Sequence, residues 1–400
     1  MLAALFGVAM GLPAIPFYTI GIFAPILAAE FGWSFASIFA GLSLLAAGVL
    51  LAGPAVGFLV DRLGARRVAS ISLPCLGLSY MALAASNGSL GRYYVTWAAI
   101  ALCGLGATPV VFTRAISSAF EARRGLALGI ALSGTGLFTV MVKPLAQVLI
   151  SAAGWRAAIV VIGALPLLIA APVVAWGLAG EDRQPARKPV ENAIPQEMSA
   201  RDAFRSRAFW LLAIVFVPMS LAVAALLPNI ENILRSLRLP PAQVVQLAAL
   251  VGIATSTGRL LGGVLVDRFW APAVGTVILT MGAVACLIFS LGVTGFLPAL
   301  AAILLLGLTS GIEFDLMAYL VARYLGLRSY GATYAVLYGV FVIGAFVGPS
   351  LHGYAYDRTG SYSGIMAASA ILLVAGALVI LLLGPYPERP SRALHEAVER

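Results

Sequence analysis

The feature that most constrains this chain is the recurrence, from one end to the other, of apolar stretches of about 20 residues. Such a stretch can cross a bilayer as a helix, which satisfies its own backbone hydrogen bonds. Only 10% of the 400 residues are charged, against about 25% in soluble proteins. A transmembrane β-barrel would instead show alternating segments of about 10 residues. The sequence therefore predicts an all-α, multi-pass membrane protein.

Twelve membrane spans are predicted from the positions of these stretches. Their approximate ranges are 2–28, 35–60, 68–86, 94–118, 125–151, 157–178, 209–234, 243–266, 272–293, 298–322, 331–355 and 363–384. Between the sixth and seventh spans lies one long polar stretch with prolines and mixed charges, which is typical of a surface linker. The predicted parts are a six-helix bundle at 1–178, a cytoplasmic linker at 179–207, a six-helix bundle at 208–388 and a cytoplasmic tail at 389–400.

Arginine and lysine residues are unevenly distributed between the loops, and this bias predicts the orientation. With the N-terminus inside, most of them lie on the cytoplasmic side, so both termini are expected to be cytoplasmic in a cell inner or plasma membrane. This topology explains the net charge of +9, and no nucleic-acid partner is expected. No charged residue precedes Glu30, which leaves open whether a short lead-in precedes the sequence given.

The sequence shows no pattern typical of a metal site or an enzyme. Cys75, Cys103 and Cys286 lie in apolar runs without metal-ligand spacing, and we interpret them as small buried hydrophobic residues. A Ser–His arrangement, an HExxH motif and a metal-spaced acid cluster are all missing from the sequence. The phosphate-binding loop of ATP-driven pumps is missing too. We predict no cofactor, no metal and no enzymatic activity.

The two halves of the chain carry matching motifs. Gly57-x-x-x-Asp61-Arg62 corresponds to Gly263-x-x-x-Asp267-Arg268, an offset of 206 residues. Gly136 to Pro144 in the fifth span corresponds to Gly339 to Pro349 in the eleventh, at offsets near 205. Two pairs at a shared offset indicate a duplicated six-helix unit. Many secondary transporters are built from such repeats, with the substrate site between them near the bilayer midplane.

The segment from Gly57 to Arg67, GFLVDRLGARR, resembles the signature loop between spans two and three of the major facilitator superfamily. The resemblance implies twelve transmembrane helices in two pseudo-symmetric six-helix bundles. It also implies a charge network that holds the halves together at the cytoplasmic end and acts as a conformational latch. The residues that this resemblance assigns to the latch are Gly57, Asp61, Arg62, Gly64, Arg66, Arg67, Gly263, Asp267 and Arg268. The alternative is that these charges only anchor the topology.

Within that superfamily, the chain is most similar to the branch of monocarboxylate transporters and oxalate–formate exchangers. The similar segments are Thr257 to Gly263 in the eighth span, Arg124 to Ala131 before the fifth and Gly154-Trp155-Arg156 after it. In that branch an arginine of the eighth span binds the substrate carboxylate, and Arg259 is the matching position. The chain departs from its relatives at Thr255, where the animal transporters have an aspartate, and it has no lysine in span one or eleven.

Two cations inside predicted spans are candidate substrate ligands. An arginine near the centre of a membrane helix costs about 2.5–3.5 kcal/mol on insertion scales, so Arg259 should face a cavity or a partner. Its fork of donors matches a carboxylate, although a structural ion pair would also explain it. Lys143 lies next to Pro144 in the fifth span. It is a candidate for a second contact, and snorkelling to the outer surface is the alternative.

The remaining candidates are acids and tyrosines. Glu313 and Asp315 lie near the middle of the tenth span, where either acid would carry a proton, neutralise Arg259 or form a structural pair. Tyr18, just beyond the kink that two prolines predict in span one, is a candidate substrate ligand. Tyr338 in span eleven is another, with Tyr334 one turn before it. Packing is the alternative for each ring. For Arg114 in span four we expect a structural role or a pair with Glu121.

These features favour a secondary transporter of organic mono- or dicarboxylates that works by alternating access. The expected driving force is proton symport or anion exchange, and the expected partners are a small organic anion, a proton or counter-anion and the lipid bilayer, with a monomeric protein. A facilitator that exports drugs or amphipathic compounds is a first alternative, although its cavity should lack a central cation. A membrane sensor on a transporter scaffold is the second, although the linker and tail are short for signalling.

Overall fold

A computed structural model describes residues 1–120, 123–179 and 198–387, and every regular element in these ranges is a helix. The elements of the first half are α1 (Leu2–Ala9), α2 (Ala14–Phe31), α3 (Phe35–Leu63), α4 (Ala65–Met81), η1 (Ala82–Ala85), α5 (Leu90–Gly104), η2 (Leu105–Ala107), α6 (Pro109–Ala119), α7 (Arg124–Leu132), α8 (Gly134–Leu165), η3 (Pro166–Ala170) and α9 (Ala171–Gly177). Those of the second half are α10 (Ala200–Arg205), α11 (Arg207–Met219), η5 (Ser220–Ala224), α12 (Ala225–Ser236), α13 (Pro241–Arg268), α14 (Ala271–Ser290), α15 (Phe296–Tyr324), α16 (Tyr330–Thr359) and α17 (Ser363–Leu381).

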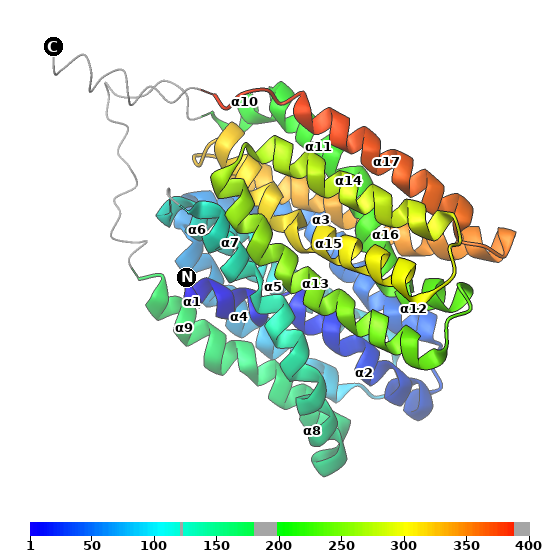
Figure 1. Cartoon of the computed structure of the whole chain (residues 1–400). Helices are drawn as coiled ribbons and strands as arrows, with labels where there is room; N and C mark the ends of the chain where they lie inside the picture. Colours follow the sequence, from blue (N-terminus) through cyan, green and yellow to red (C-terminus); the bar gives the residue numbers. More distant parts are fainter. Residues whose placement is uncertain (121–122, 180–197, 388–400) are drawn as a thin grey trace.

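These helices account for the twelve predicted spans. Ten stretches of the described residues are long and apolar enough to cross a membrane. One of them, Arg124–Gly177, contains two predicted spans, which meet where Gly154 leaves the helical conformation. The span predicted at 209–234 consists of α11, η5 and α12. The first-half helices, in blue to teal, lie mainly on one side of the molecule, and the green to red second-half helices on the other (Figure 1).

Two spans are broken where they cross each other in the first half. The predicted kink in span one appears as an interruption between α1 and α2, and η2 interrupts span four. The amide of Leu12 in the first break donates to the carbonyl oxygen of Ala107 in the second at 3.1 Å. A Cβ atom on Gly11 would lie 2.3 Å from that same oxygen. The glycine therefore allows two irregular backbones to satisfy each other inside the protein, as the membrane interior requires.

Single glycines make the tightest connections between helices. Gly64 joins α3 to α4 with φ 84° and ψ 153°. Gly154 has φ 83° and ψ 168°, and it separates the two helical segments that share the label α8. A side chain would strain the backbone at these positive φ values. These residues thus explain why successive spans follow each other with almost no loop.

The two halves of the chain touch through two pairs of glycines. Cβ atoms on Gly57 and Gly331 would each lie within 2.4 Å of the other's carbonyl oxygen, where α3 meets α16. The same holds for Gly125 and Gly263, where α7 meets α13. Gly57 of the first contact and Gly263 of the second are 206 positions apart, and so are Gly125 of the second and Gly331 of the first. The contact is therefore duplicated along with the helices, as small residues at close helix crossings allow.

Not every predicted part falls on described residues. Most of the predicted linker and the whole tail at 389–400 lie outside them. The linker's last residues include a short helix, α10, whose N-cap Ser199 accepts a hydrogen bond from the amide of Asp202 at 3.3 Å. The boundaries of the two six-helix parts remain predictions.

Candidate functional site

Asp61, at the end of α3, links the two halves at the first glycine contact. Its Oδ1 atom accepts hydrogen bonds from the amide of Gly331 at 2.9 Å, and its Oδ2 atom accepts one from Ala332 at 3.0 Å. These amides open α16, so the carboxylate caps that helix and meets its positive dipole end. Arg114 of α6 donates from Nε to Asp61 Oδ1 at 2.9 Å. Arg114 thus has the structural role expected for it, while Glu121 lies outside the described residues.

Asp267, at the end of α13, makes the reciprocal contact. It accepts hydrogen bonds from the amides of Gly125 at 2.7 Å and Leu126 at 2.9 Å, which lie at the start of α7. Each half of the chain therefore supplies one carboxylate and one helix N-terminus to the other. We call these two contacts the Asp61 latch and the Asp267 latch.

Among the described residues, the arginines near the two latch aspartates do not make the same contacts with helix N-termini. Arg66 donates from Nε to the carbonyl oxygen of Ala175 in α9 at 2.8 Å, a contact inside the first half. Arg62 and Arg268 are exposed and form no hydrogen bond or ion pair with another described residue. Arg67 is also exposed. In this structure, backbone amides thus occupy the Asp267 carboxylate, while Asp61 binds amides and Arg114.

Arg259 lies on α13 between the two halves and is only 8% exposed. Its Nη1 atom donates to the carbonyl oxygen of Leu132 at 2.6 Å, at the end of α7. The helix is held close on both sides by glycines. A Cβ atom on Gly129 of α7 would lie 2.5 Å from the Arg259 carbonyl oxygen, and one on Gly311 of α15 would lie 2.9 Å from its amide nitrogen. The backbone that carries this cation is therefore rigidly positioned.

Glu313 and Asp315 lie on α15, which packs closely against α13 at Arg259, and the charge of Arg259 acts on both carboxyl groups. They are 2% and 0% exposed. Within the described residues, Glu313 Oε1 and both carboxyl oxygens of Asp315 have no hydrogen-bond partner, and neither acid forms an ion pair with Arg259. A buried polar atom that lacks a partner is costly. We call Arg259, Glu313 and Asp315 the Arg259 cluster, and no described residue uses the hydrogen-bonding capacity of these carboxyl oxygens.

Tyrosines line α16 beside this cluster. The rings of Tyr330, Tyr334 and Tyr338 stack along the helix, with centroid distances of 5.5 Å and 6.3 Å. Tyr334 lies in electrostatic range of Asp315 and Arg259, and Tyr338 in range of Tyr18 on α2. The tyrosines therefore connect the start of α16, which Asp61 caps, with the candidate site residues of both halves.

Lys143 belongs to α8, but its side chain lies outside the described residues. Earlier in the same helix, a Cβ atom on Gly136 would lie 3.1 Å from Ser256 Oγ of α13, so α8 runs beside the helix of Arg259. His352, which is 1% exposed, bonds through Nδ1 with the carbonyl oxygen of Gly348 in its own helix at 2.8 Å. In the described part of the chain, no group of three or more potential metal ligands occurs.

Sequence reasoning missed the partners that belong to the backbone. It named Arg259 and both latch aspartates, but not the Leu132 carbonyl or the amides of Gly125 and Gly331. A signal existed for the latches, because both glycines precede apolar helical runs at the shared offset. The break in span four also had a signal in its Gly104, Gly106 and Thr108-Pro109 sequence.

Comparison with known proteins agrees with this geometry. The profile of the Major Facilitator Superfamily matches residues 6–337 and 219–399. Monocarboxylate transporter 11 of Homo sapiens is 28% identical over 383 residues, covering 91% of this chain and 78% of that protein. A probable sulfoacetate transporter, SauU, of Cupriavidus necator is 26% identical over 400 residues, covering 92% of this chain and 89% of that one.

Solved structures show the same fold. The Escherichia coli fucose:proton symporter FucP superposes with a TM-score of 0.69 at 16% identity, over 96% of this chain and 97% of that one. The proton:xylose symporter XylE superposes with a TM-score of 0.70 at 12% identity, over 96% and 94% of the two chains. At these identities the likeness concerns the arrangement of helices alone.

Proposed function

Because the chain belongs to the major facilitator superfamily, we propose that this membrane transporter moves small organic carboxylates by alternating access, with Arg259 as the carboxylate ligand. The observation that carries the proposal is a buried guanidinium between the two halves, bonded to one backbone carbonyl among the described residues. An arginine has five N–H donors, so it can donate further hydrogen bonds to a charged partner. The relatives named for monocarboxylates and sulfoacetate support an anionic substrate.

The bond between Arg259 and Leu132 suggests how binding would affect the halves. Leu132 belongs to the first half and Arg259 to the second, so this hydrogen bond joins them. A substrate carboxylate is a stronger acceptor than a neutral carbonyl, because charge-assisted hydrogen bonds are roughly twice as strong. We expect substrate to replace the carbonyl and so to weaken one contact between the halves. A ligand shifts a conformational equilibrium only through such a difference between its two states.

Glu313 and Asp315 are the proposed coupling groups. Neither acid forms an ion pair with Arg259 among the described residues, but the charges act on each other, so either carboxylate would offset the guanidinium when substrate is absent and would take up a proton when a substrate anion occupies it. Their unpartnered oxygens support this role, because such buried groups are rare unless they have a function. Exchange of one anion for another on Arg259 is the alternative driving force. Lys143 is the proposed second cation for dicarboxylates, and Tyr18 and Tyr338 are proposed to contact the substrate.

The two latches would close one end of the transport path. We propose that this end is cytoplasmic, in agreement with the arginine bias of the loops, and that one monomer is the transporting unit. With both latches formed, substrate would reach Arg259 from the opposite end. Breaking them would expose the site to the cytoplasm.

A binding screen tests the carboxylate site. Purified protein is heated with mono-, di- and sulfonated carboxylates, and the shift in melting temperature is compared for wild type, Arg259→Gln and Arg259→Lys. Loss of the guanidinium should weaken binding by about 3 kcal/mol, roughly 100-fold, while lysine should retain part of the affinity. Arg238→Gln is the matched control, because Arg238 is exposed in the loop before α13. Equal stabilisation of wild type and Arg259→Gln by a carboxylate would remove Arg259 from the site.

Uptake measurements separate the coupling groups. Proton symport predicts uptake that increases under an inward proton gradient and that Asp315→Asn or Glu313→Gln weakens. Indifference to the gradient, with uptake that needs an internal anion, would favour exchange. Lys143→Met should reduce uptake of dicarboxylates more than that of monocarboxylates. If the variant takes up dicarboxylates as fast as wild type does, Lys143 is not a second substrate ligand.

A further inference from the structure

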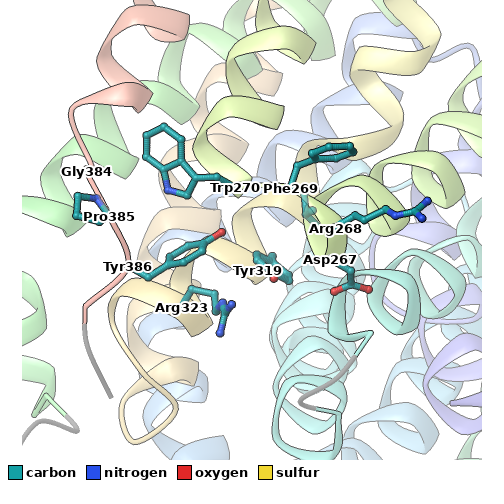
Figure 2. Close-up of a pocket in the computed structure, with 10 residues that line it drawn as sticks. Asp267, Arg268, Phe269, Trp270, Tyr319, Arg323, Gly384, Pro385 and Tyr386 are labelled. Atoms are coloured by element: carbon teal, nitrogen blue, oxygen red, sulfur yellow. The ribbon is translucent and has the colours of Figure 1, made fainter. Parts of the chain in front are cut away.

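A cavity of about 650 Å³ lies beside the Asp267 latch, at the ends of α13 and α15. Its walls come from three segments far apart in the sequence (Figure 2). Asp267 comes from the last turn of α13 and Trp270 from its connection to α14, Tyr319 and Arg323 come from the last turns of α15, and Tyr386 from the chain after α17. It is separate from the Arg259 cluster, which lies eight residues earlier in α13, about 12 Å along the helix at roughly 1.5 Å per residue.

Hydrogen bonds hold the walls of this cavity in place. The Tyr324 hydroxyl donates to the carbonyl oxygen of Gly384 at 2.5 Å and accepts from the Trp270 indole at 3.3 Å. The amide of Ala271 donates to the Tyr386 hydroxyl at 2.8 Å. The chain after α17 is therefore tied to the start of α14. The cavity is a built feature of the second half rather than a gap between loose segments.

Arg323 supplies a cation that the cavity does not neutralise. Its guanidinium carbon lies 4.6 Å from the centre of the Tyr386 ring and 5.7 Å from that of Tyr319. Its buried Nε atom has no hydrogen-bond partner among the described residues. Asp267 is the one acidic side chain on the described walls, and backbone amides of α7 bind both of its oxygens. Arg268 also lines the cavity, but its side chain points away from Arg323 (Figure 2).

The surroundings of the cavity match the level of lipid headgroups. It lies where two spans end, and its rim carries Phe269, which is 59% exposed. Tyrosine and tryptophan side chains, which line it here, concentrate at the membrane–water interface. Basic pockets between helices on the cytoplasmic side bind phosphate-bearing headgroups. An arginine with free N–H groups and an aromatic support suits a phosphate oxygen.

We propose that this cavity binds the phosphate group of a phospholipid on Arg323 and that the bound lipid stabilises the Asp267 latch. The connection is direct, because Asp267 lines the cavity and also caps α7. A headgroup held by Arg323 restricts the end of α13 and so keeps the carboxylate in place for the amides of Gly125 and Leu126. The proposal does not depend on which substrate is transported.

The test measures lipid binding by the purified full-length protein. Phosphatidylglycerol is titrated into the detergent-solubilised transporter, and bound lipid is counted by native mass spectrometry. Arg323→Gln should bind about tenfold more weakly than wild type, because one charge-assisted contact is lost. Arg328→Gln is the matched control, since Arg328 is an exposed cation in the loop after α15 and does not line the cavity. If Arg323→Gln does not fold, Tyr386→Leu removes the ring beside the guanidinium and should weaken binding several-fold.

Two further arms identify the source of the phosphate and the link to the latch. If inorganic phosphate leaves lipid binding unchanged, the phosphate that binds in the cavity is that of a lipid headgroup. If inorganic phosphate at millimolar concentrations displaces the lipid, the cavity binds soluble phosphates. Hydrogen–deuterium exchange at Gly125 and Leu126 should slow when lipid is added to wild type and should not change in Arg323→Gln. Equal lipid binding by wild type, Arg323→Gln and Tyr386→Leu would overturn the site. Lipid binding without slower exchange would overturn its link to the latch.

Discussion

Replacing Asp267 by asparagine should open the contact between the two halves. The carboxylate accepts hydrogen bonds from the amides of Gly125 and Leu126 at 2.7 Å and 2.9 Å. Asparagine has one acceptor oxygen, so one amide keeps a neutral bond and the other meets an NH2 group. A hydrogen bond to a charged group contributes about 1.5–3 kcal/mol and a neutral one about 1 kcal/mol. The latched state should therefore lose about 3 kcal/mol, which is roughly a 100-fold shift in the equilibrium.

Hydrogen–deuterium exchange measures this shift at the amides themselves. In Asp267→Asn, exchange at Gly125 and Leu126 should become up to about 100-fold faster. If the halves separate as rigid bodies, exchange at Gly331 and Ala332, on the other latch, should also become faster. Asp202→Asn is the control, because Asp202 is an exposed carboxylate in α10.

The two latches should differ in strength. Asp61 makes the same pair of amide contacts and in addition an ion pair with Arg114, whose side chain is 18% exposed. Asp61→Asn should therefore accelerate exchange more than Asp267→Asn does. Unchanged exchange at Gly331 in Asp267→Asn would refute the coupling of the two latches, and the carboxylate would then be only a local helix cap. Equal exchange in Asp267→Asn and Asp202→Asn would refute the latch altogether.

Two further substitutions test the glycine contact beside the Asp61 latch and a hydrogen bond elsewhere in the first half. Gly331→Ala would place a Cβ atom 2.4 Å from the Gly57 carbonyl oxygen, so it should disfavour the latched state and accelerate exchange at the Gly331 amide and its neighbours. Trp155→Phe removes the indole N–H that donates to Glu30 at 2.5 Å, and it should lower stability by about 1–3 kcal/mol in thermal unfolding, because the bond is to a charged group.

Each of these substitutions has a matched control in the chain. Gly353 lies in the same helix as Gly331, and a Cβ atom there meets nothing within 4 Å. Gly353→Ala should leave exchange at the latch unchanged. Trp176 is 90% exposed, and Trp176→Phe should change stability by less than about 0.5 kcal/mol. A Gly331→Ala protein with wild-type exchange, or equal melting of the two tryptophan variants, would contradict the packing described above.

Much of the fold could be predicted from the sequence because hydrophobic length and repetition determine it. Apolar stretches long enough to span a bilayer gave the helices, and the 206-residue offset between Asp61 and Asp267 gave the duplication. The interruptions of the spans were harder to predict, because the break at Leu105–Ala107 is as apolar as the helix around it and only neighbouring glycines and Pro109 mark it. Pro13 and Pro16 marked the break in span one because proline lacks a backbone N–H and is favoured at the start of a helix, and both lie at the start of α2.

The candidate site was predictable as far as it consists of unusual side chains. Arg259, Glu313 and Asp315 stand out because charges are rare inside membrane helices. Their partners do not stand out, because the Leu132 carbonyl and the Gly331 amide belong to a backbone that is the same at every residue. Which backbone group meets which side chain depends on how closely two helices approach, and that follows from packing in three dimensions.

The two latches also have a consequence for each half taken separately. The first half contains both a carboxylate, Asp61, and a capped helix start, Gly125 and Leu126, and the second half contains the equivalent pair. Such an arrangement resembles an isologous interface within one chain, because each half supplies the same kind of groups to the other. An isolated first half would expose both Asp61 and the amides of Gly125 and Leu126, and we expect it to associate with a second copy through these groups.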